Sequence, residues 1–434
     1  MYSLSRILKR TYLIMVFCCF VPSVNAGIQG ITGTTFNLTT STANIPTPDG
    51  NSVHMWGYSV AGSPMQYPGP TLIVNEGEVI TVNLTNTNIP MPVSILFPGQ
   101  ENVQATGGSP GPLTRESAGS SAVEIVTYTF TATNPGTYTY YSGSQPGLQI
   151  EMGLMGALIV RPATAGQAYN DISGDSAYDR EYLFVLSEID PVVHQDVEFG
   201  LIGSINNTIS HSTLWFMNGR LGPDTFFPDN SSFLPNQPYG SIAQMLPGEK
   251  VLVRVIGGGR EGHPLHLHGN NFNQIARDGR LLSADGLTPD LAVSDYTLQV
   301  LPGATYDSIW TWTGEKLGFD IYGSAATGGV DHTCTPAAGS DFDTNTHEYC
   351  PDHGKPIKVV LPEKQDLTFG GFYSGSPFLG ALADLPPGEG GLNMNGGLFF
   401  MWHSHNEREL TNDDIYPGGM MTMMIIEPPG TNIP

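Results

Sequence analysis

The sequence predicts an all-β protein made of sandwich or barrel domains. It contains 53 glycines and 34 prolines, and only 13% of its residues are charged, which leaves little room for long amphipathic helices. Short runs of alternating apolar and polar residues are instead bounded by turn residues, a pattern typical of strands. These runs span residues 71–84, 124–130, 136–141, 155–160, 250–255, 296–301 and 420–427. Many short strands with turns rich in Gly and Pro indicate β-sandwiches or barrels.

The chain is long enough for more than one such unit. Its 434 residues would suffice for two or three β-sandwich domains. We expect two, an N-terminal domain over residues 27–162 and a C-terminal domain over 179–434, joined by a linker rich in Ala and Gly at 163–178. The second domain is expected to carry a long insertion around residues 323–395, where Gly, Asp and Pro are frequent.

The first 26 residues have the pattern of an export signal. Basic residues precede an apolar run at 12–21, and small residues follow it. We therefore expect residues 1–26 to be removed and the protein to be secreted or periplasmic. No later apolar run is long enough for a membrane span. Because the signal holds three cations and no acid, its removal would change the formal charge from −23 to −26.

The acidic surface that remains limits the classes of partner that the protein can bind. Such a surface repels nucleic acid, and it could attract metal cations or a basic redox partner. The simpler interpretation, that the acidity keeps a secreted protein soluble, explains the charge equally well.

Two cysteines remain once the export signal is removed, Cys334 and Cys350. In an oxidising compartment this pair favours a disulfide. The alternative is a metal site, because Cys350-x-x-His353 has the spacing of metal ligands. Three histidines lie near the cysteines in sequence: His332, His347 and His353.

Two short segments carry the main candidate metal ligands. One contains His263, His266 and His268, and the other contains His403 and His405. Because side chains alternate along a strand, His266 and His268 should share one face, as should His403 and His405. If the two strands are neighbours, four imidazoles converge while His263 lies on the opposite side. Imidazole suits copper or zinc. The alternative, histidines that serve only in packing, explains two His-x-His strands poorly.

In these segments the chain resembles the multicopper oxidases, and the likeness covers nearly the whole sequence after the signal. The stretch His263-Pro-Leu-His266-Leu-His268-Gly269 matches the His-x-x-His-x-His-Gly motif of that family. The resemblance implies tandem cupredoxin-like Greek-key domains and a copper-dependent oxidoreductase. By the family pattern His263 would bind a type 1 copper and His266 the type 2 copper of a trinuclear cluster. His268, His403 and His405 would bind the coupled pair of that cluster.

The second segment departs from the family pattern at the type 1 copper. Ser404 stands where the family has the cysteine whose thiolate binds this copper, and a hydroxyl is a poor substitute for a soft thiolate. The next type 1 histidine of the family falls on Glu409. The axial ligand could correspond to Met420, although the preceding loop is longer than usual. We therefore expect no type 1 copper.

The N-terminal domain departs from the pattern as well. Residues 94–99 align with the family's Ser-Ile-His-Trp-His-Gly, and residues 136–143 align with Gly-Thr-Tyr-x-Tyr-His-Ser-His. The four cluster ligands of these segments are replaced by Leu96, Pro98, Tyr141 and Gly143. Only four of the eight cluster histidines thus remain.

The sequence therefore predicts a secreted copper-binding protein that is by family an oxidoreductase but lacks type 1 copper and a complete trinuclear cluster. Two-domain relatives form trimers, so the resemblance also implies a homotrimer. Two alternatives remain open, a non-enzymatic protein for copper storage, delivery or detoxification, and a structural scaffold whose histidines hold no metal.

Overall fold

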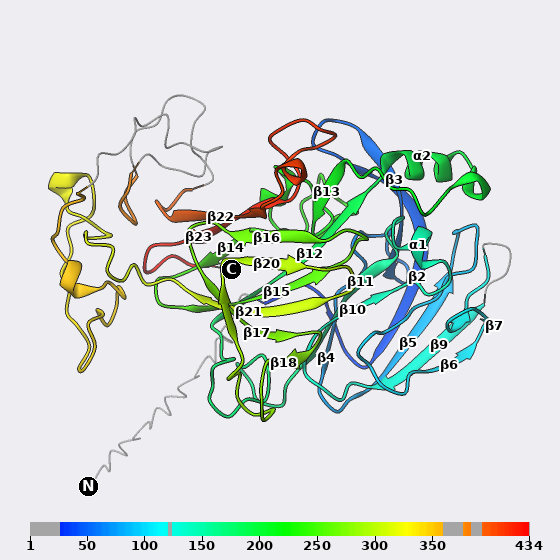
Figure 1. Cartoon of the computed structure of the whole chain (residues 1–434), viewed down its shortest axis with the longest axis horizontal. Coiled ribbons are helices and arrows are strands. Elements are labelled where there is room, and N and C mark those ends of the chain that lie inside the picture. Colours follow the sequence, from blue (N-terminus) through cyan, green and yellow to red (C-terminus); the bar gives the residue numbers. More distant parts are fainter. Residues whose placement is uncertain (1–26, 120–123, 359–375, 383–392, 434) are drawn as a thin grey trace, which may run out of the picture.

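The computed structural model describes residues 27–119, 124–358, 376–382 and 393–433. The predicted export signal lies outside the described residues, as do two stretches of the predicted insertion, 359–375 and 383–392. The described part consists mostly of strands (Figure 1), so the all-β prediction is confirmed. None of its helices is long and apolar enough to cross a membrane.

Two facing sheets form the N-terminal half. Their strand orders are β3-β2-β5-β9-β6 and β1-β4-β11-β10, and β7 pairs with β8 separately. In β5 and β9 every second side chain, such as Val82 and Tyr128, is buried in the core between the sheets. The strands are β1 (Ile31–Thr32), β2 (Thr35–Pro46), β3 (Ser52–Val60), β4 (Leu72–Asn75), β5 (Val79–Asn86), β6 (Gln104–Gly107), β7 (Ser109–Pro110), β8 (Arg115–Glu116), β9 (Ile125–Thr131), β10 (Gly136–Tyr141) and β11 (Met155–Arg161).

The C-terminal half repeats this plan with longer sheets. One follows the order β13-β12-β15-β21-β17-β18, with β19 paired to β17, and the other follows β14-β23-β22-β16-β20. Phe184, Trp310 and Trp402 belong to the core that both sheets share. The strands are β12 (Arg180–Ile189), β13 (Leu214–Met217), β14 (Ala243–Met245), β15 (Lys250–Gly257), β16 (His263–Leu267), β17 (Phe272–Arg277), β18 (Arg280–Leu281), β19 (Val293–Asp295), β20 (Thr297–Val300), β21 (Thr305–Thr311), β22 (Leu398–Ser404) and β23 (Met421–Ile426).

Helices are short and lie in the connections. The two α-helices of the described residues are α1 (Pro146–Gln149) and α2 (Pro191–Glu198), and Asp190 caps the second by accepting a hydrogen bond from the Val192 amide. The 3₁₀ helices are η1 (Ile202–Ser204), η2 (Asp224–Phe226), η3 (Ala325–Thr327), η4 (Cys350–Asp352) and η5 (Glu407–Leu410).

A buried ion-pair network joins the two halves. Arg254 on β15 is fully buried, and its guanidinium contacts Glu181 at 3.2 Å and Asp307 at 3.5 Å. The same guanidinium donates a 3.0 Å hydrogen bond to the hydroxyl of Thr137, which lies on β10 of the N-terminal half. The three charges lie in the C-terminal half, and the hydrogen bond to Thr137 connects them to the N-terminal half.

The strand predictions differ from the structure mainly at one turn. The run predicted at 71–84 is divided into β4 and β5, because Gly77 adopts a left-handed φ of 82° between them. Within the predicted linker, Ala168 and Tyr169 pack in a cluster with Leu252 of β15. The boundaries of the two domains stay a prediction.

The predicted disulfide is confirmed. Cys334 and Cys350 are bonded, with their Cα atoms 5.6 Å apart. Since neither sulfur is then a thiolate, the alternative metal site with cysteine ligands is not formed. The disulfide lies in the part of the insertion that the structure describes.

Candidate metal centre

Strand pairing brings the two histidine segments together. β16 and β22 run antiparallel, with His266 directly opposite His403. Leu267 and Trp402 form the next pair and are buried in the core, so alternation turns the two histidines to the other face of the sheet. The pairing continues beyond β16, where the amide of His268 donates to the carbonyl of Met401 at 2.9 Å.

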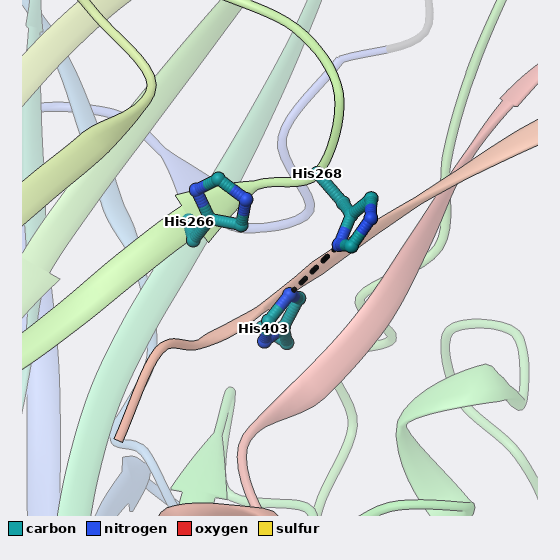
Figure 2. A group of neighbouring side chains, drawn as sticks. All are labelled: His266, His268 and His403. Atoms are coloured by element: carbon teal, nitrogen blue, oxygen red, sulfur yellow. Dashed lines mark hydrogen bonds between the residues drawn. The ribbon is translucent and has the colours of Figure 1, made fainter. Parts of the chain in front are cut away.

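Four imidazoles gather on this face. Figure 2 shows the rings of His266, His268 and His403 converging on one volume, and a nitrogen from each ring lies within 4.8 Å of the other two. His268 Nδ1 and His403 Nε2 are 3.4 Å apart. His405 lies beside them, with its ring centroid 4.9 Å from that of His266. We call this group the four-histidine cluster.

In two of these rings a hydrogen bond to a backbone carbonyl determines which nitrogen has a lone pair for a metal ion. Nδ1 of His266 donates to the carbonyl of Tyr296 at 2.8 Å, and Nδ1 of His403 donates to the carbonyl of Ser404 at 2.7 Å. Because a carbonyl oxygen only accepts, each Nδ1 carries the proton and each Nε2 keeps its lone pair in the neutral ring. Histidines that bind metals are oriented in the same way, by donating the other ring N–H to a backbone carbonyl.

The charge state of the cluster also suits metal ligands. Burial, together with the neighbouring imidazoles, lowers the pKa of His403 to about 4 despite its hydrogen bond to Ser404. Burial likewise lowers the pKa of His266. Both rings are therefore neutral at pH 7, the form that binds a metal ion. His268 and His405 are exposed, so the cluster is open to solvent on one side.

His263, the fifth histidine of the two segments, lies apart from the cluster. Its ring is fully buried, with Nε2 2.9 Å from Glu188 and Nδ1 2.9 Å from Glu409. Burial alone would oppose protonation, but the hydrogen bonds and charges of the two carboxylates outweigh it and raise the pKa of His263 to about 9. His263 is therefore a cation between two anions, and both of its nitrogens are already occupied.

Comparisons with known proteins show which family the chain resembles. Residues 42–165 match the family model of the multicopper oxidases. An L-ascorbate oxidase of Cucurbita pepo var. melopepo is 35% identical over 164 residues, which are 37% of this chain and 28% of that protein. An L-ascorbate oxidase of Brassica rapa subsp. pekinensis is 31% identical over 161 residues, 36% of this chain and 26% of that protein. These matches support a likeness to the multicopper oxidase superfamily.

Solved structures share the architecture of this chain over most of its length. The blue copper oxidase from Nitrosomonas europaea has a TM-score of 0.55 at 19% identity, covering 90% of this chain and 85% of that one. The multicopper oxidase mgLAC has a TM-score of 0.55 at 18% identity, covering 92% and 87%. At such identities the likeness shows the cupredoxin-like fold. Copper is the cofactor of the multicopper oxidases. The two L-ascorbate oxidases are about four times as long as the region that each shares with this chain.

Residues at the expected type 1 positions meet in the structure. Glu409, which stands where the family has its second type 1 histidine, contacts His263 directly. Ser404 is buried close by, and its hydroxyl accepts a hydrogen bond from the amide of Asn406, whose side chain in turn donates to Glu409. The amide of Met420 donates to the carbonyl of Glu409. Two carboxylates thus hold His263, and the Ser404 hydroxyl is connected to Glu409 through Asn406.

The expected N-terminal ligand positions also come together, without metal ligands. The amide of Leu96 donates to the carbonyl of Tyr141 at 2.8 Å. A methyl group added at Gly143 would lie 2.8 Å from Leu96 Cγ, so the leucine side chain fills the space beside the glycine. Apolar packing therefore takes the place of imidazoles here.

Sequence reasoning missed two features of these sites. Glu188 follows no recognisable motif, and only the fold brings it to His263, 75 positions away. The carbonyl of Tyr296 could not be assigned either, because β20 becomes a neighbour of β16 only through the sheet order. The contact between His263 and Glu409, in contrast, follows from the resemblance, because the family has a type 1 copper ligand at each of these two positions.

Proposed function

We propose that this protein binds one copper ion at the four-histidine cluster and does not carry out four-electron reduction of oxygen. The convergence of the imidazole nitrogens of His266, His268 and His403, with the His405 ring beside them, is the observation that supports copper binding. Nitrogen ligands with water completing the shell suit copper, and two of the rings are oriented by carbonyls as metal ligands are. When bound, copper would supply one-electron redox chemistry on the solvent side of the cluster.

The same proposal excludes type 1 copper. His263 was expected to be a ligand, but its two nitrogens pair with Glu188 and Glu409, so we leave it out of the copper shell. Without the thiolate there is no entry site for electrons, and without the N-terminal histidines the trinuclear cluster lacks half its ligands. A non-enzymatic role in copper storage, delivery or detoxification follows most directly from these losses.

Copper affinity of matched variants tests the proposed ligands. We expect His266→Ala and His403→Ala each to weaken Cu(II) binding at least tenfold in competition titrations, because each removes one nitrogen and disturbs its neighbours. His211→Ala is the control, since this exposed histidine belongs neither to the four-histidine cluster nor to the group around His263. His263→Gln should retain wild-type affinity. Equal affinity of all four variants would contradict the proposal and favour a scaffold whose histidines hold no metal.

Oxygen consumption tests the missing oxidase chemistry. The copper-loaded protein should consume no oxygen with a phenol or with Cu(I) as the electron donor. Steady oxygen uptake that disappears in His266→Ala would show that a working cluster forms, and would contradict the proposal.

We further propose that the protein is secreted or periplasmic and forms a homotrimer. A neighbouring subunit could cover the exposed edges of His268 and His405, and the negative charge could attract a basic redox partner. Light scattering with and without copper tests the assembly, because a monomer under both conditions would contradict it. N-terminal sequencing of the exported protein tests cleavage after residue 26.

A further inference from the structure

A second group of metal-ligand side chains lies away from β16 and β22, in the segment that follows β21. In Figure 1 this yellow segment projects from the edge of the C-terminal sheets. It brings together Asp320, His332, Glu348 and His353, each with a nitrogen or carboxylate oxygen within 4.8 Å of those of the others. The disulfide braces the group, because Cys334 and Cys350 each lie two positions after one of its members.

Each of the two histidines contacts both carboxylates. The Nε2 atom of His332 lies 2.9 Å from Glu348 Oε2 and 3.6 Å from Asp320 Oδ1. The Nδ1 atom of His353 lies 3.0 Å from Glu348 Oε1 and 3.5 Å from Asp320 Oδ2. Each imidazole therefore faces one oxygen of each carboxylate, and all four groups point to a common centre.

The hydrogen bond on the far side of His332 makes this arrangement unusual. Its Nδ1 donates to the carbonyl of Val330 at 3.0 Å, so in the neutral ring Nε2 carries a lone pair. That lone pair faces a carboxylate oxygen of Glu348, which also has only lone pairs to offer. A proton or a metal ion between them turns this repulsion into attraction, and a carbonyl behind the ring holds the imidazole as it does in histidines that bind a metal.

Burial adds to the demand for a cation. The side chains of Asp320 and Glu348 are only 3% and 1% exposed. Among the described residues these two carboxylates form ion pairs with His332 and His353, and Asp320 also accepts hydrogen bonds from the amides of Tyr322, Gly323 and Gly354. Buried carboxylates are stable when they are paired or bind a metal, and a metal ion at this centre would contact both of them.

The spacing matches a tetrahedral metal ion. With metal–ligand bonds of about 2.0–2.1 Å, the edges of a tetrahedral zinc site are about 3.3 Å long. The four nitrogen–oxygen separations, which involve both oxygens of each carboxylate, range from 2.9 to 3.6 Å and are close to this length. Two imidazoles with two carboxylates are also ligands that zinc accepts, whereas Cu(II) favours a square-planar or tetragonal arrangement.

We propose that Asp320, His332, Glu348 and His353 form a structural zinc site that, with the neighbouring disulfide, holds this segment in its fold. Four protein ligands complete the tetrahedral shell, which is the pattern of structural rather than catalytic zinc. The site is independent of the four-histidine cluster, so either proposal can fail without the other.

Zinc stoichiometry in a background without the cluster tests the site. The full chain carrying His266→Ala and His403→Ala should retain one zinc per chain after dialysis, and zinc should raise its thermal midpoint. Adding His332→Ala or His353→Ala should abolish zinc retention. His347→Asn is the control, since His347 is exposed in the same segment and asparagine tolerates its backbone φ of 54°.

Two further measurements keep the test independent of folding defects. Glu348→Gln preserves the shape of the side chain and should weaken zinc binding at least tenfold. Co(II) bound in place of zinc should give the intense visible absorption of a tetrahedral ion. No zinc retention in the background variant, or equal retention with His332→Ala, would overturn the site and leave two imidazolium–carboxylate pairs in its place.

Discussion

Replacing His263 with glutamine should destabilise the protein by several kcal/mol. The imidazolium is fully buried between Glu188 and Glu409, whose side chains are 1% and 2% exposed. Removing the cation leaves two buried carboxylates without their partner, and breaking a buried ion pair costs about 3–5 kcal/mol. The rise in the pKa of His263 from 6.5 to about 9 gives a similar size, about 3 kcal/mol at about 1.4 kcal/mol per pKa unit.

This contribution should depend on pH with a defined sign. The pKa of His263 is higher in the folded state, about 9, than in the unfolded state, about 6.5. The stabilisation is therefore fully present below pH 6.5 and is lost as the pH rises through about 9. The free energy of unfolding of the wild type should exceed that of the variant by the full amount at pH 6 and by much less at pH 10.

Urea denaturation followed by tryptophan fluorescence at both pH values measures these differences. The control His211→Gln changes an exposed side chain and should alter the free energy of unfolding by less than about 0.5 kcal/mol. A loss below about 1 kcal/mol for His263→Gln at pH 6, or an equal loss at pH 6 and pH 10, would refute the charged triad.

Three further predictions follow from the sites. Ser404→Cys should not give an intense blue absorption after copper loading, because His263 is held by two carboxylates, and such a band would contradict the missing type 1 site. Replacing Cys334 and Cys350 by serine should cost about 3 kcal/mol of local stability, seen as faster amide hydrogen exchange between them; unchanged exchange would contradict this. Gly143→Ala should lower the free energy of unfolding by about 1–3 kcal/mol, because the added methyl group collides with Leu96. Adding Leu96→Ala should restore part of that stability in thermal melts, whereas additive losses of the two variants would exclude the contact.

Alternation along strands made much of the fold and of the cluster predictable. β10 spans the predicted residues 136–141, and other predicted strands differ from the structure by one or two residues at their ends. The same period of two predicted a shared face for His266 and His268 and another for His403 and His405, and the pairing of β16 with β22 sets His266 opposite His403. Local patterns succeed here because each strand has one buried and one exposed face.

Contacts between distant segments were beyond local patterns. Glu188 lies on β12, and nothing in its neighbourhood in sequence relates it to His263. The sequence also placed His332 and His353 near the cysteines but gave no sign of their shared contacts with Asp320, which depend on the course of a loop without regular strands. Side-chain partners across such loops are decided by three-dimensional packing, so only a structure reveals them.

Copper content and the electron paramagnetic resonance spectrum of the dialysed Cu(II)-loaded protein show whether the four-histidine cluster binds copper. We expect about one copper per chain, without intense blue colour and with hyperfine splitting from several imidazole nitrogens. His266→Ala and His403→Ala together should remove this signal. Absence of retained copper, or several coppers with a blue type 1 signal, would show that the cluster does not bind copper as proposed.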